Sequence, residues 1–253
     1  MKNPAAPVIG VVLLAALAAI ALPGQKAPGP AGNKEALAVL NRMIVALGGR
    51  KALESIKDMT VTGTVEAPEI GLTSPFVLYQ KEPDKMRMDI TVAEAATTIT
   101  QAFDGRRGWG TDARTMRPEE MPEGESRDVS HKALGNAALL DPRSLGVTYA
   151  LKPKQTLGDR DYIVLEQTLA DGHKVTLFLD PATYLPFKTQ TRSLDQTGAE
   201  VDAETFAGDY RKVGATMVAH SIRVLHNGAE AQRIAITSVT YNSNLEDAFF
   251  ILK

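Results

Sequence analysis

The glycine-rich stretch "FDGRRGWG", residues 103–110, carries residue types that could bind phosphate. A phosphate-binding P-loop needs Gly-Lys-Ser/Thr at the start of a helix, whereas Thr111-Asp112 follows the last glycine here. A dinucleotide-binding fingerprint needs a strand–helix–strand unit around its glycines. Because the flanking residues alternate as strands do, we expect a hairpin with its turn at Asp104-Gly105 and Trp109 on a strand.

Histidine is the next residue type that could do chemistry, and its spacing does not suggest a metal site. The chain has four of them: His131, His173, His220 and His226. The last two would share one face of a strand but lie about 20 Å apart. Motifs such as His-Glu-x-x-His are absent from the sequence. We therefore expect solvated or capping histidines, no metal ligand and no cofactor.

No nucleophile motif accompanies these residues. The sequence has no cysteine and no Gly-x-Ser-x-Gly elbow. Glu200, Asp202 and Glu204 alternate along one stretch, a pattern typical of the solvated face of a strand. We therefore expect no catalytic residue and a protein that is not an enzyme. A hydrolase that brings carboxylates together from different strands is the third and weakest hypothesis.

Composition describes an ordinary globular chain with a hydrophobic core. Of 253 residues, 44% are hydrophobic and 23% are charged, and the formal net charge is −2. That charge argues against nucleic acid as a partner, because nucleic-acid-binding domains are usually strongly basic. The lack of cysteine excludes disulfides, thiolate metal sites and a lipid attached to an N-terminal cysteine.

The N-terminal segment has the features of an export signal. Lys2 precedes an apolar run from Val8 to Leu22, which as a helix would measure about 22 Å, less than a bilayer core. We expect residues 1–21 to be a signal peptide and residues 22–32 a Pro/Gly-rich linker. An uncleaved membrane anchor is the alternative. Either interpretation places the domain that follows, residues 33–253, outside the cytoplasm.

Three helices are expected. The segment 33–47 has apolar residues at helical spacing, Asn33 as its N-cap and Gly48-Gly49 as its C-cap. A second, short helix should cover residues 50–57. Residues 128–140 fit a third helix, and the polar, proline-containing segment 113–127 before it is expected to be a mobile loop.

The rest of the chain alternates with a period of two. In "KMRMDITV", residues 85–92, apolar and polar residues alternate, as in a half-buried strand. Similar segments recur about every ten residues, and Asp-Gly and Asn-Gly pairs such as Asn227-Gly228 separate some of them. The fold class expected is α+β, mostly antiparallel β: a highly curved sheet of about eleven strands with two or three helices available to plug it.

A curved sheet of this size encloses more volume than its own side chains fill. Methionine suits adaptable apolar surfaces, and Met86 and Met88 stand on one strand face, although core packing is the simpler explanation for them. We expect a cavity of lipid size. The candidate lipid-binding residues are Phe76, Leu78, Met86, Met88, Ile90, Trp109 and Tyr149.

Five stretches, in preserved order, resemble the LolA-like superfamily of periplasmic lipoprotein carriers and sensors. They are "ALGGRKALESIKDMTVTGTV", "AFDGRRGW", "LFLDPATYLPFK", "FAGDYRKVGATMVAHSI" and "VTYNSNLEDAFF". The resemblance spans nearly all of residues 33–250. It implies an unclosed eleven-stranded barrel whose helices cover an apolar cavity. Val218 and Asn244 depart from it, since relatives often have proline there.

The expected function is a periplasmic binding or carrier protein for lipid or for the acyl chains of lipoproteins. Its partners would be a lipid or an acylated lipoprotein, with membrane contact that is transient or made through an uncleaved N-terminal anchor. The alternative is an envelope-stress or lipid sensor that binds a protein partner in the cell envelope.

Overall fold

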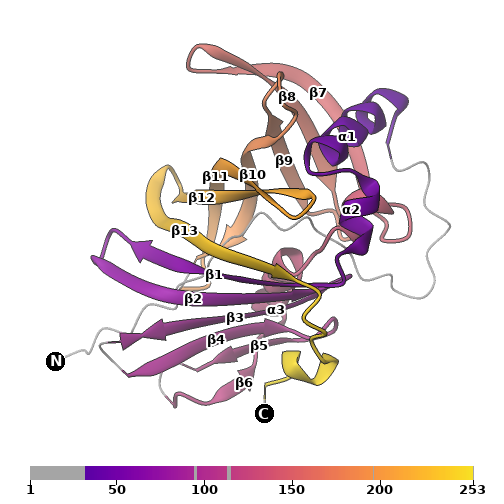
Figure 1. Ribbon diagram of the computed structural model, residues 1–253. Helices are drawn as coiled ribbons and strands as arrows, with labels where there is room; N and C mark the ends of the chain where they lie inside the picture. The colour runs from indigo at the N-terminus through magenta and orange to yellow at the C-terminus, as the bar shows by residue number, and fades with distance from the viewer. Residues whose placement is uncertain (1–31, 94–95, 113–114, 196, 253) are drawn as a thin grey trace.

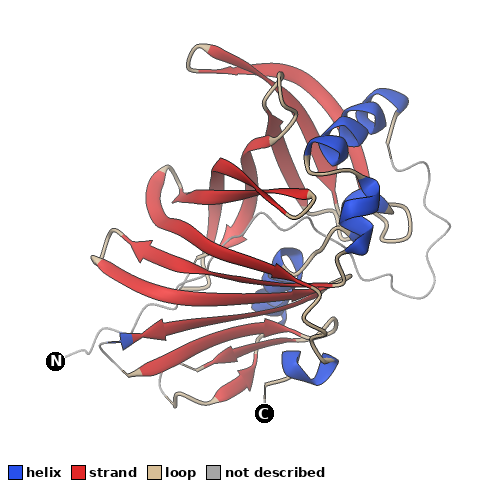
Figure 2. Cartoon of the chain, in the orientation of Figure 1, coloured by secondary structure: helices blue, strands red, loops and turns tan. Residues whose placement is uncertain are grey.

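One antiparallel sheet of thirteen strands dominates the structure (Figures 1 and 2). This computed structural model describes residues 32–93, 96–112, 115–195 and 197–252, so the predicted signal peptide and most of the predicted linker lie outside the described residues. The strand order is β6-β5-β4-β3-β2-β1-β13-β12-β11-β10-β9-β8-β7. The bounds are β1 Asp58–Ala67, β2 Leu72–Lys81, β3 Lys85–Val92, β4 Thr97–Phe103, β5 Gly108–Thr111, β6 Pro118–Glu120, β7 Thr148–Leu157, β8 Arg160–Thr168, β9 Lys174–Leu179, β10 Pro186–Leu194, β11 Glu200–Val213, β12 Thr216–His226 and β13 Ala229–Tyr241.

The sheet curls but does not close, because β6 and β7 end the strand order without pairing to each other. The prediction of an unclosed, mostly antiparallel barrel is therefore confirmed, with two more strands than expected. Free strand edges invite pairing with other chains. Here Pro118 lies on β6 and Pro153 on β7, and the register of β7 shifts between Lys152 and Gln155. Proline and an irregular register both discourage edge pairing.

The alternation predicted for residues 85–92 is confirmed. Met86, Met88 and Ile90 on β3 are buried, whereas Thr91 is exposed. Cross-strand partners keep the faces aligned, since Met88 lies opposite Leu78 of β2. The buried face of this half of the sheet is therefore apolar.

The glycine-rich stretch is a hairpin turn, as predicted. β4 and β5 pair through Phe103 and Gly108, and the Oδ1 atom of Asp104 accepts hydrogen bonds from the backbone N–H groups of Arg106 and Arg107, both at 2.8 Å. Gly105 has a φ of 92°, a conformation that glycine adopts without steric cost. Strand β5 follows this turn directly, so the stretch lacks the helix N-terminus that a phosphate-binding loop needs.

Four α-helices lie against the sheet: α1 Lys34–Ala46, α2 Arg50–Ser55, α3 Glu123–Lys132 and α4 Ala137–Leu140. A 3-10 helix, η2 Asp247–Phe250, follows the last strand. The predicted first helix and its cap are confirmed, because the Asn33 side chain accepts from the N–H of Ala36 at 2.8 Å. None of the described helices is both long enough and apolar enough to span a bilayer.

Two predictions for the middle of the chain are wrong. The segment expected as a loop, 113–127, contains β6 and the first half of α3. Helix α3 begins directly after Pro122, and Glu123 and Glu125 in its first turn suit the positive end of a helix. The helix expected over residues 128–140 is broken, since α3 ends at Lys132 and α4 begins at Ala137.

The half-buried carboxylate of Glu82 explains the break. Glu82 accepts hydrogen bonds from the backbone N–H groups of Asn136 at 2.6 Å and Ala137 at 3.2 Å, at the start of α4. A side chain at Gly135 would collide with this carboxylate, because an ideal Cβ would lie 2.3 Å from its oxygens. Burial raises the pKa of Glu82 although these two N–H groups act to lower it. The chain between the helices therefore wraps around Glu82.

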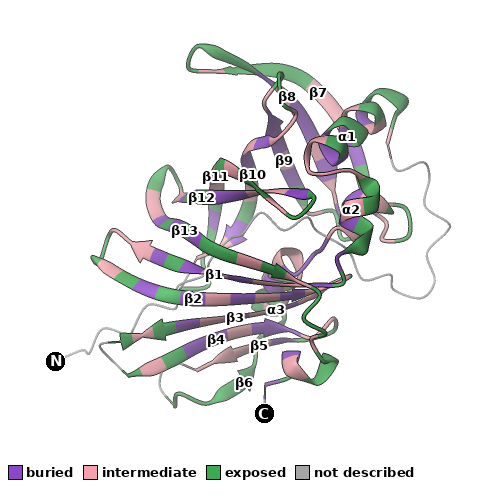
Figure 3. Ribbon diagram, viewed as in Figure 1, coloured by how far each residue is buried: buried purple, intermediate pink, exposed green. Residues whose placement is uncertain are grey.

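Two apolar clusters lie between the sheet and the helices. The first lies under α1, α2 and α4 and includes side chains from β7, β8 and β9. The second lies under α3, where Val129 and Ala133 contact the concave faces of β1 to β4, β12 and β13. The helices therefore cover the concave side of the curved sheet in two groups (Figures 1 and 3).

Candidate functional site: an apolar cavity beneath the helices

A cavity of about 220 Å³ lies between the helices and the concave face of the sheet. All four helices contribute to its wall, together with strands from both halves of the sheet. Most of the inner wall is apolar. The apolar lining residues from helices and inner strands are Met43, Leu47, Leu53, Ile56, Met59, Val61, Leu139, Val175 and Leu177.

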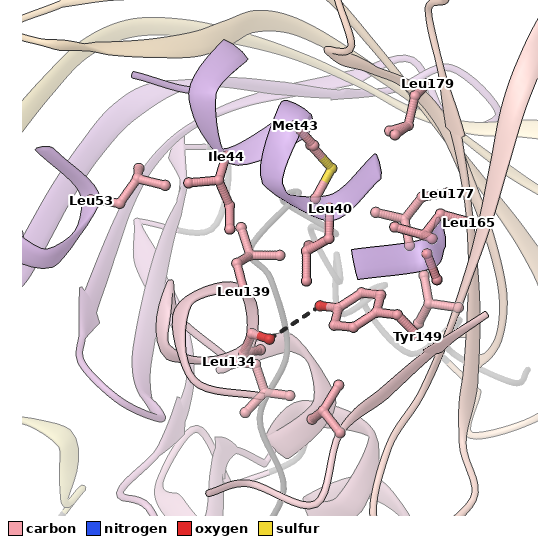
Figure 4. Packing of buried hydrophobic residues seen from close by; sticks show 14 of the residues in the cluster. Leu40, Met43, Ile44, Leu53, Leu134, Leu139, Tyr149, Leu165, Leu177 and Leu179 are labelled. Carbon is pink, nitrogen blue, oxygen red and sulfur yellow. Dashed lines mark hydrogen bonds between the residues drawn. The ribbon is translucent and has the colours of Figure 1, made fainter. Parts of the chain in front are cut away.

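Helix α1 closes the cavity with one face. Leu40, Met43 and Ile44 recur at helical spacing and are 1–3% exposed. Figure 4 shows them pointing from α1 toward Leu139 of α4 and the leucines of β8 and β9. Burying one such side chain stabilises the fold by about 1.5–3 kcal/mol. The cover is therefore held chiefly by apolar contact with the cavity walls.

The turn between α1 and α2 rests on the β11–β12 hairpin. The backbone N–H of Met217 donates to the carbonyl of Leu47 at 3.0 Å. Gly48 has a φ of 128°, and a Cβ at this position would lie 2.4 Å from the carbonyl oxygen of Ala215. Only glycine fits such a close approach. The predicted glycine C-cap therefore also docks the cover onto the rim of the cavity.

Few polar contacts fasten the outer side of α1 and α2. Arg42 on α1 donates to the hydroxyl of Tyr184 at 2.5 Å, and its guanidinium lies 5.2 Å from the centre of that ring. Arg50 on α2 donates to the carbonyl of Leu140 at 2.9 Å. Both contacts are exposed, and exposed contacts of this kind contribute little to stability.

A buried polar chain ties α4 to the sheet below the cavity. The Gln167 amide donates to the hydroxyl of Tyr149 at 2.7 Å. That hydroxyl donates to the carbonyl of Ala138 at 3.2 Å, the bond dashed in Figure 4. Burial raises the pKa of Tyr149 well above its ordinary value. Tyr149 therefore stays neutral and serves as a donor that fixes α4.

Asp128 anchors α3 to β10. Its Oδ1 atom accepts from the Ser193 hydroxyl at 2.8 Å and from the Leu194 N–H at 3.1 Å, while Oδ2 lies 2.5 Å from the Lys132 ammonium. Burial acts to raise the pKa of Asp128, but the Lys132 charge and these hydrogen bonds outweigh it and hold the pKa below its ordinary value. The ionised carboxylate is therefore the state that holds α3 in place.

We expect Asp128→Asn to lower the free energy of unfolding at neutral pH by about 1–3 kcal/mol, because Lys132 loses its partner. A depressed pKa stabilises the fold above the ordinary value of 3.8 and loses that effect as the pH falls through the folded value. The deficit of the variant should therefore shrink below about pH 4. Urea unfolding at neutral pH and at pH 3 measures it, with the exposed Asp202→Asn as control. A deficit that is the same at both pH values would contradict this role.

Two histidines, His131 and His173, lie side by side in the wall of the cavity. The rings of His131 and His173 stack with centroids 4.0 Å apart, and Asp171 contacts His131 at 2.7 Å. Burial, followed by the nearby His131, lowers the pKa of His173 to about 4. The sequence placed these residues far apart, and nothing in their spacing predicted that they would meet.

This histidine pair offers neither a metal site nor an evident nucleophile. Among the residues that the structure describes, no group of three or more metal-ligating side chains comes together. The Thr191 hydroxyl lies 2.7 Å from Nε2 of His173, but it also donates to the carbonyl of Lys174 at 2.8 Å. A hydroxyl engaged with the backbone in this way supports the strand more than it serves as a nucleophile.

A second, polar cleft of about 610 Å³ lies on the other side of α3. Three hairpin turns, β6 and α3 surround it, and Asp128 and Lys132 line both hollows. The helix therefore separates an apolar cavity from a polar cleft. The other acidic residues of the cleft are Glu69, Asp112, Glu119, Glu120, Glu125, Asp195 and Glu230.

The seven residues predicted to bind lipid do not form one group. Phe76, Leu78, Met86, Met88 and Ile90 belong to the cluster beneath α3. Tyr149 belongs to the other cluster. Trp109 is half-buried on β5, and its indole N–H donates to Asp104 at 3.2 Å. None of the seven lines the cavity or the cleft described above, so their role in binding stays a prediction.

Residues that sequence reasoning missed line the cavity instead. Met43 and Leu53 lie on the expected helices, so their membership in a buried face could have been inferred from helical spacing. Val175 and Leu177 lie on an expected strand. Periodicity identifies the buried face of each element, but it does not tell which part of that face borders an unfilled space.

No protein-family model and no curated protein matches the sequence. Solved structures do match it. A LolA superfamily protein from Nitrosomonas europaea is 15% identical, with 85% of this chain and 97% of that chain covered and a TM-score of 0.57. An outer membrane lipoprotein-sorting protein domain from Vibrio parahaemolyticus is 14% identical, with coverages of 86% and 96% and a TM-score of 0.59.

A DUF1329 family protein from Desulfovibrio piger is likewise 15% identical, with 87% of this chain and 98% of that chain covered and a TM-score of 0.58. At identities of 14–15%, the similarity is evidence for a shared backbone fold only. The three alignments cover 85–87% of this chain and 96–98% of the other chains, so the similarity is not confined to one part of the fold. The chain has the LolA-like fold that its sequence motifs predict.

Proposed function

We propose that this chain is an extracytoplasmic binding protein that carries the acyl chain of a lipid or a lipoprotein in the cavity beneath its helices. The apolar cavity is the observation that carries this proposal. Ligand sites are typically concave and mostly apolar, with a few polar groups at the rim. The lipoprotein-sorting domain of similar fold adds support from outside the chain.

The cavity volume sets the size of the ligand. A cavity of about 150 Å³ accepts one benzene molecule, so by proportion the 220 Å³ here hold about nine carbon atoms. Burying that many methylene groups yields about 7 kcal/mol at most. A longer acyl chain requires α1 and α2 to move outward. This movement costs apolar contacts of α1, while the exposed contacts of Arg42 and Arg50 add little to that cost.

The proposal includes export. Residues 1–21 would serve as the signal peptide, residues 22–32 as the linker, and residues 33–253 as the single ligand-binding domain in the periplasm. An uncleaved N-terminal segment would keep the domain at the membrane in the same compartment. No catalytic residue, metal or cofactor is part of the proposal.

Native mass spectrometry of protein isolated gently from the envelope tests both parts of the proposal. We expect a chain that begins between residues 22 and 28, with a noncovalent lipid or acylated peptide bound. The control is the same protein after delipidation, which should take up a single-chain fatty acid saturably and without turnover. A chain that starts at Met1 would favour the anchor. A delipidated protein that binds no apolar ligand would contradict the carrier function.

The polar cleft favours the second candidate, a sensor that binds a protein partner. Its volume of about 610 Å³ and its rim of three hairpin turns could accept a segment of polypeptide. A polypeptide that copurifies in place of a lipid, and that chemical cross-linking locates at the cleft, would support the sensor over the carrier.

A further inference from the structure

We infer that the end of the molecule carrying the α1–α2 turn is a surface that docks on an anionic lipid bilayer. This surface, called the turn surface below, consists of Val45, Leu47, Lys51, Lys212 and Met217. The inference goes beyond the proposed function, because it concerns which face meets a membrane and needs no ligand in the cavity.

An exposed apolar side chain stands at the centre of the turn surface. Val45, near the end of α1, is 72% exposed, more than any other large hydrophobic residue in the described part of the chain. Leu47, two residues further along, and Met217, which is hydrogen-bonded to Leu47, are half-buried and line the cavity. An exposed apolar side chain two residues from a residue that lines an apolar cavity is suited to enter the interface of a bilayer.

Contacts within the fold bring these residues together. The N–H of Met217 donates to the carbonyl of Leu47 at 3.0 Å, which joins the α1–α2 turn to the start of β12. Lys212 of β11 lies directly opposite Met217 in the sheet. Figure 1 shows the β11–β12 hairpin beside α2. Lys51, in the first turn of α2, follows the glycine pair closely.

The charges of the turn surface fit an anionic partner. Lys51 and Lys212 are exposed, and no acidic side chain in the described residues lies within ion-pair distance of either. The nearby acids already have cationic partners, since Glu54 pairs with Arg50 at 3.3 Å and Asp209 with Arg211 at 2.5 Å. Each unpaired basic side chain near an anionic bilayer strengthens binding about fivefold.

The opposite end has the opposite charge. Ile70, in the β1–β2 turn, is 50% exposed and therefore resembles Val45 in its apolar exposure. It lines the polar cleft, next to Glu69 and among the acidic residues described above. An anionic bilayer repels such a surface. The charges therefore orient the protein with the turn surface, and not the cleft, toward the membrane.

The lack of native cysteine allows a direct test. An environment-sensitive fluorophore is attached to Val45→Cys or to Ile70→Cys in the full chain, and vesicles are added. With phosphatidylglycerol vesicles we expect a blue-shifted, brighter emission at position 45 and none at position 70. Phosphatidylcholine vesicles should leave both probes unchanged, and salt should weaken the response at position 45.

Charge variants distinguish an effect of the turn surface from an effect of the protein's net charge. In the Val45→Cys background, the pair Lys51→Glu and Lys212→Glu should weaken vesicle binding by more than about twentyfold, because each substitution removes a positive charge and adds a negative one. The pair Lys154→Glu and Arg117→Glu changes net charge equally at exposed sites elsewhere and should have little effect. Equal responses at positions 45 and 70, or equal loss in both charge pairs, would overturn the inference. Neither result would bear on acyl binding in the cavity.

Discussion

Replacing Met88 with aspartate is expected to lower the free energy of unfolding by about 4 kcal/mol or more. Met88 is 2% exposed on β3 and lies opposite Leu78 of β2 within the cluster beneath α3. A carboxylate there would lose its hydration without gaining a partner. Chemical unfolding followed by circular dichroism measures the loss.

Thr91→Asp is the matched control. Thr91 lies on the same strand but is exposed, so the same carboxylate keeps its hydration and should cost less than about 1 kcal/mol. If both variants were equally stable, the cluster beneath α3 would not be a tightly packed core. An open second cavity at Met88 would then explain the result, and the lipid-binding role predicted for this residue would regain support.

Much of the fold follows from periodicity in the sequence. Met86, Met88 and Ile90 recur at a spacing of two because one face of β3 is buried. The turns at Asp104-Gly105 and Asn227-Gly228 follow from local chemistry, since Gly105, Asn227 and Gly228 all have positive φ. Signals of this kind lie within a few residues of the position they determine.

Long-range contacts set the features that sequence reasoning missed. Helical spacing continues past Lys132, yet the helix breaks because Glu82, more than fifty residues earlier in the chain, caps the start of α4. Strand β6 has only three residues and exists through its pairing with β5. Neither contact leaves a pattern in the local sequence.

The sequence predicted an apolar cavity, but it did not predict which residues line the cavity that the structure contains. A curved sheet with few helices implied an apolar cavity, but the predicted lining residues Met88 and Ile90 lie beneath α3, whose side chains fill that space. The cavity is lined by residues of all four helices and of other strands, and by neither of these two residues. Which half of the barrel is filled depends on how α3 packs, and α3 itself was predicted with the wrong bounds.

Replacing Val175 with phenylalanine is expected to reduce the affinity for a single-chain fatty acid such as decanoate at least tenfold. Val175 is 5% exposed on β9 and lines the cavity. In a filled core the larger ring would cost about 1–3 kcal/mol. Here the ring can enter the cavity, so we expect a stability change below about 1 kcal/mol and a loss of the space that the acyl chain needs. Calorimetric titration of delipidated protein measures the affinity.

Thr176→Phe places the same ring on the neighbouring residue, whose side chain points to the other face of the strand. Its affinity for decanoate should equal that of the unmodified protein. Ile90→Phe tests the earlier candidates, because Ile90 is buried in the filled cluster beneath α3. That variant should lose stability and keep its affinity. The reverse outcome, with Val175→Phe binding normally and Ile90→Phe failing to bind, would move the acyl site from the cavity beneath α1 and α2 to the face of β3 beneath α3.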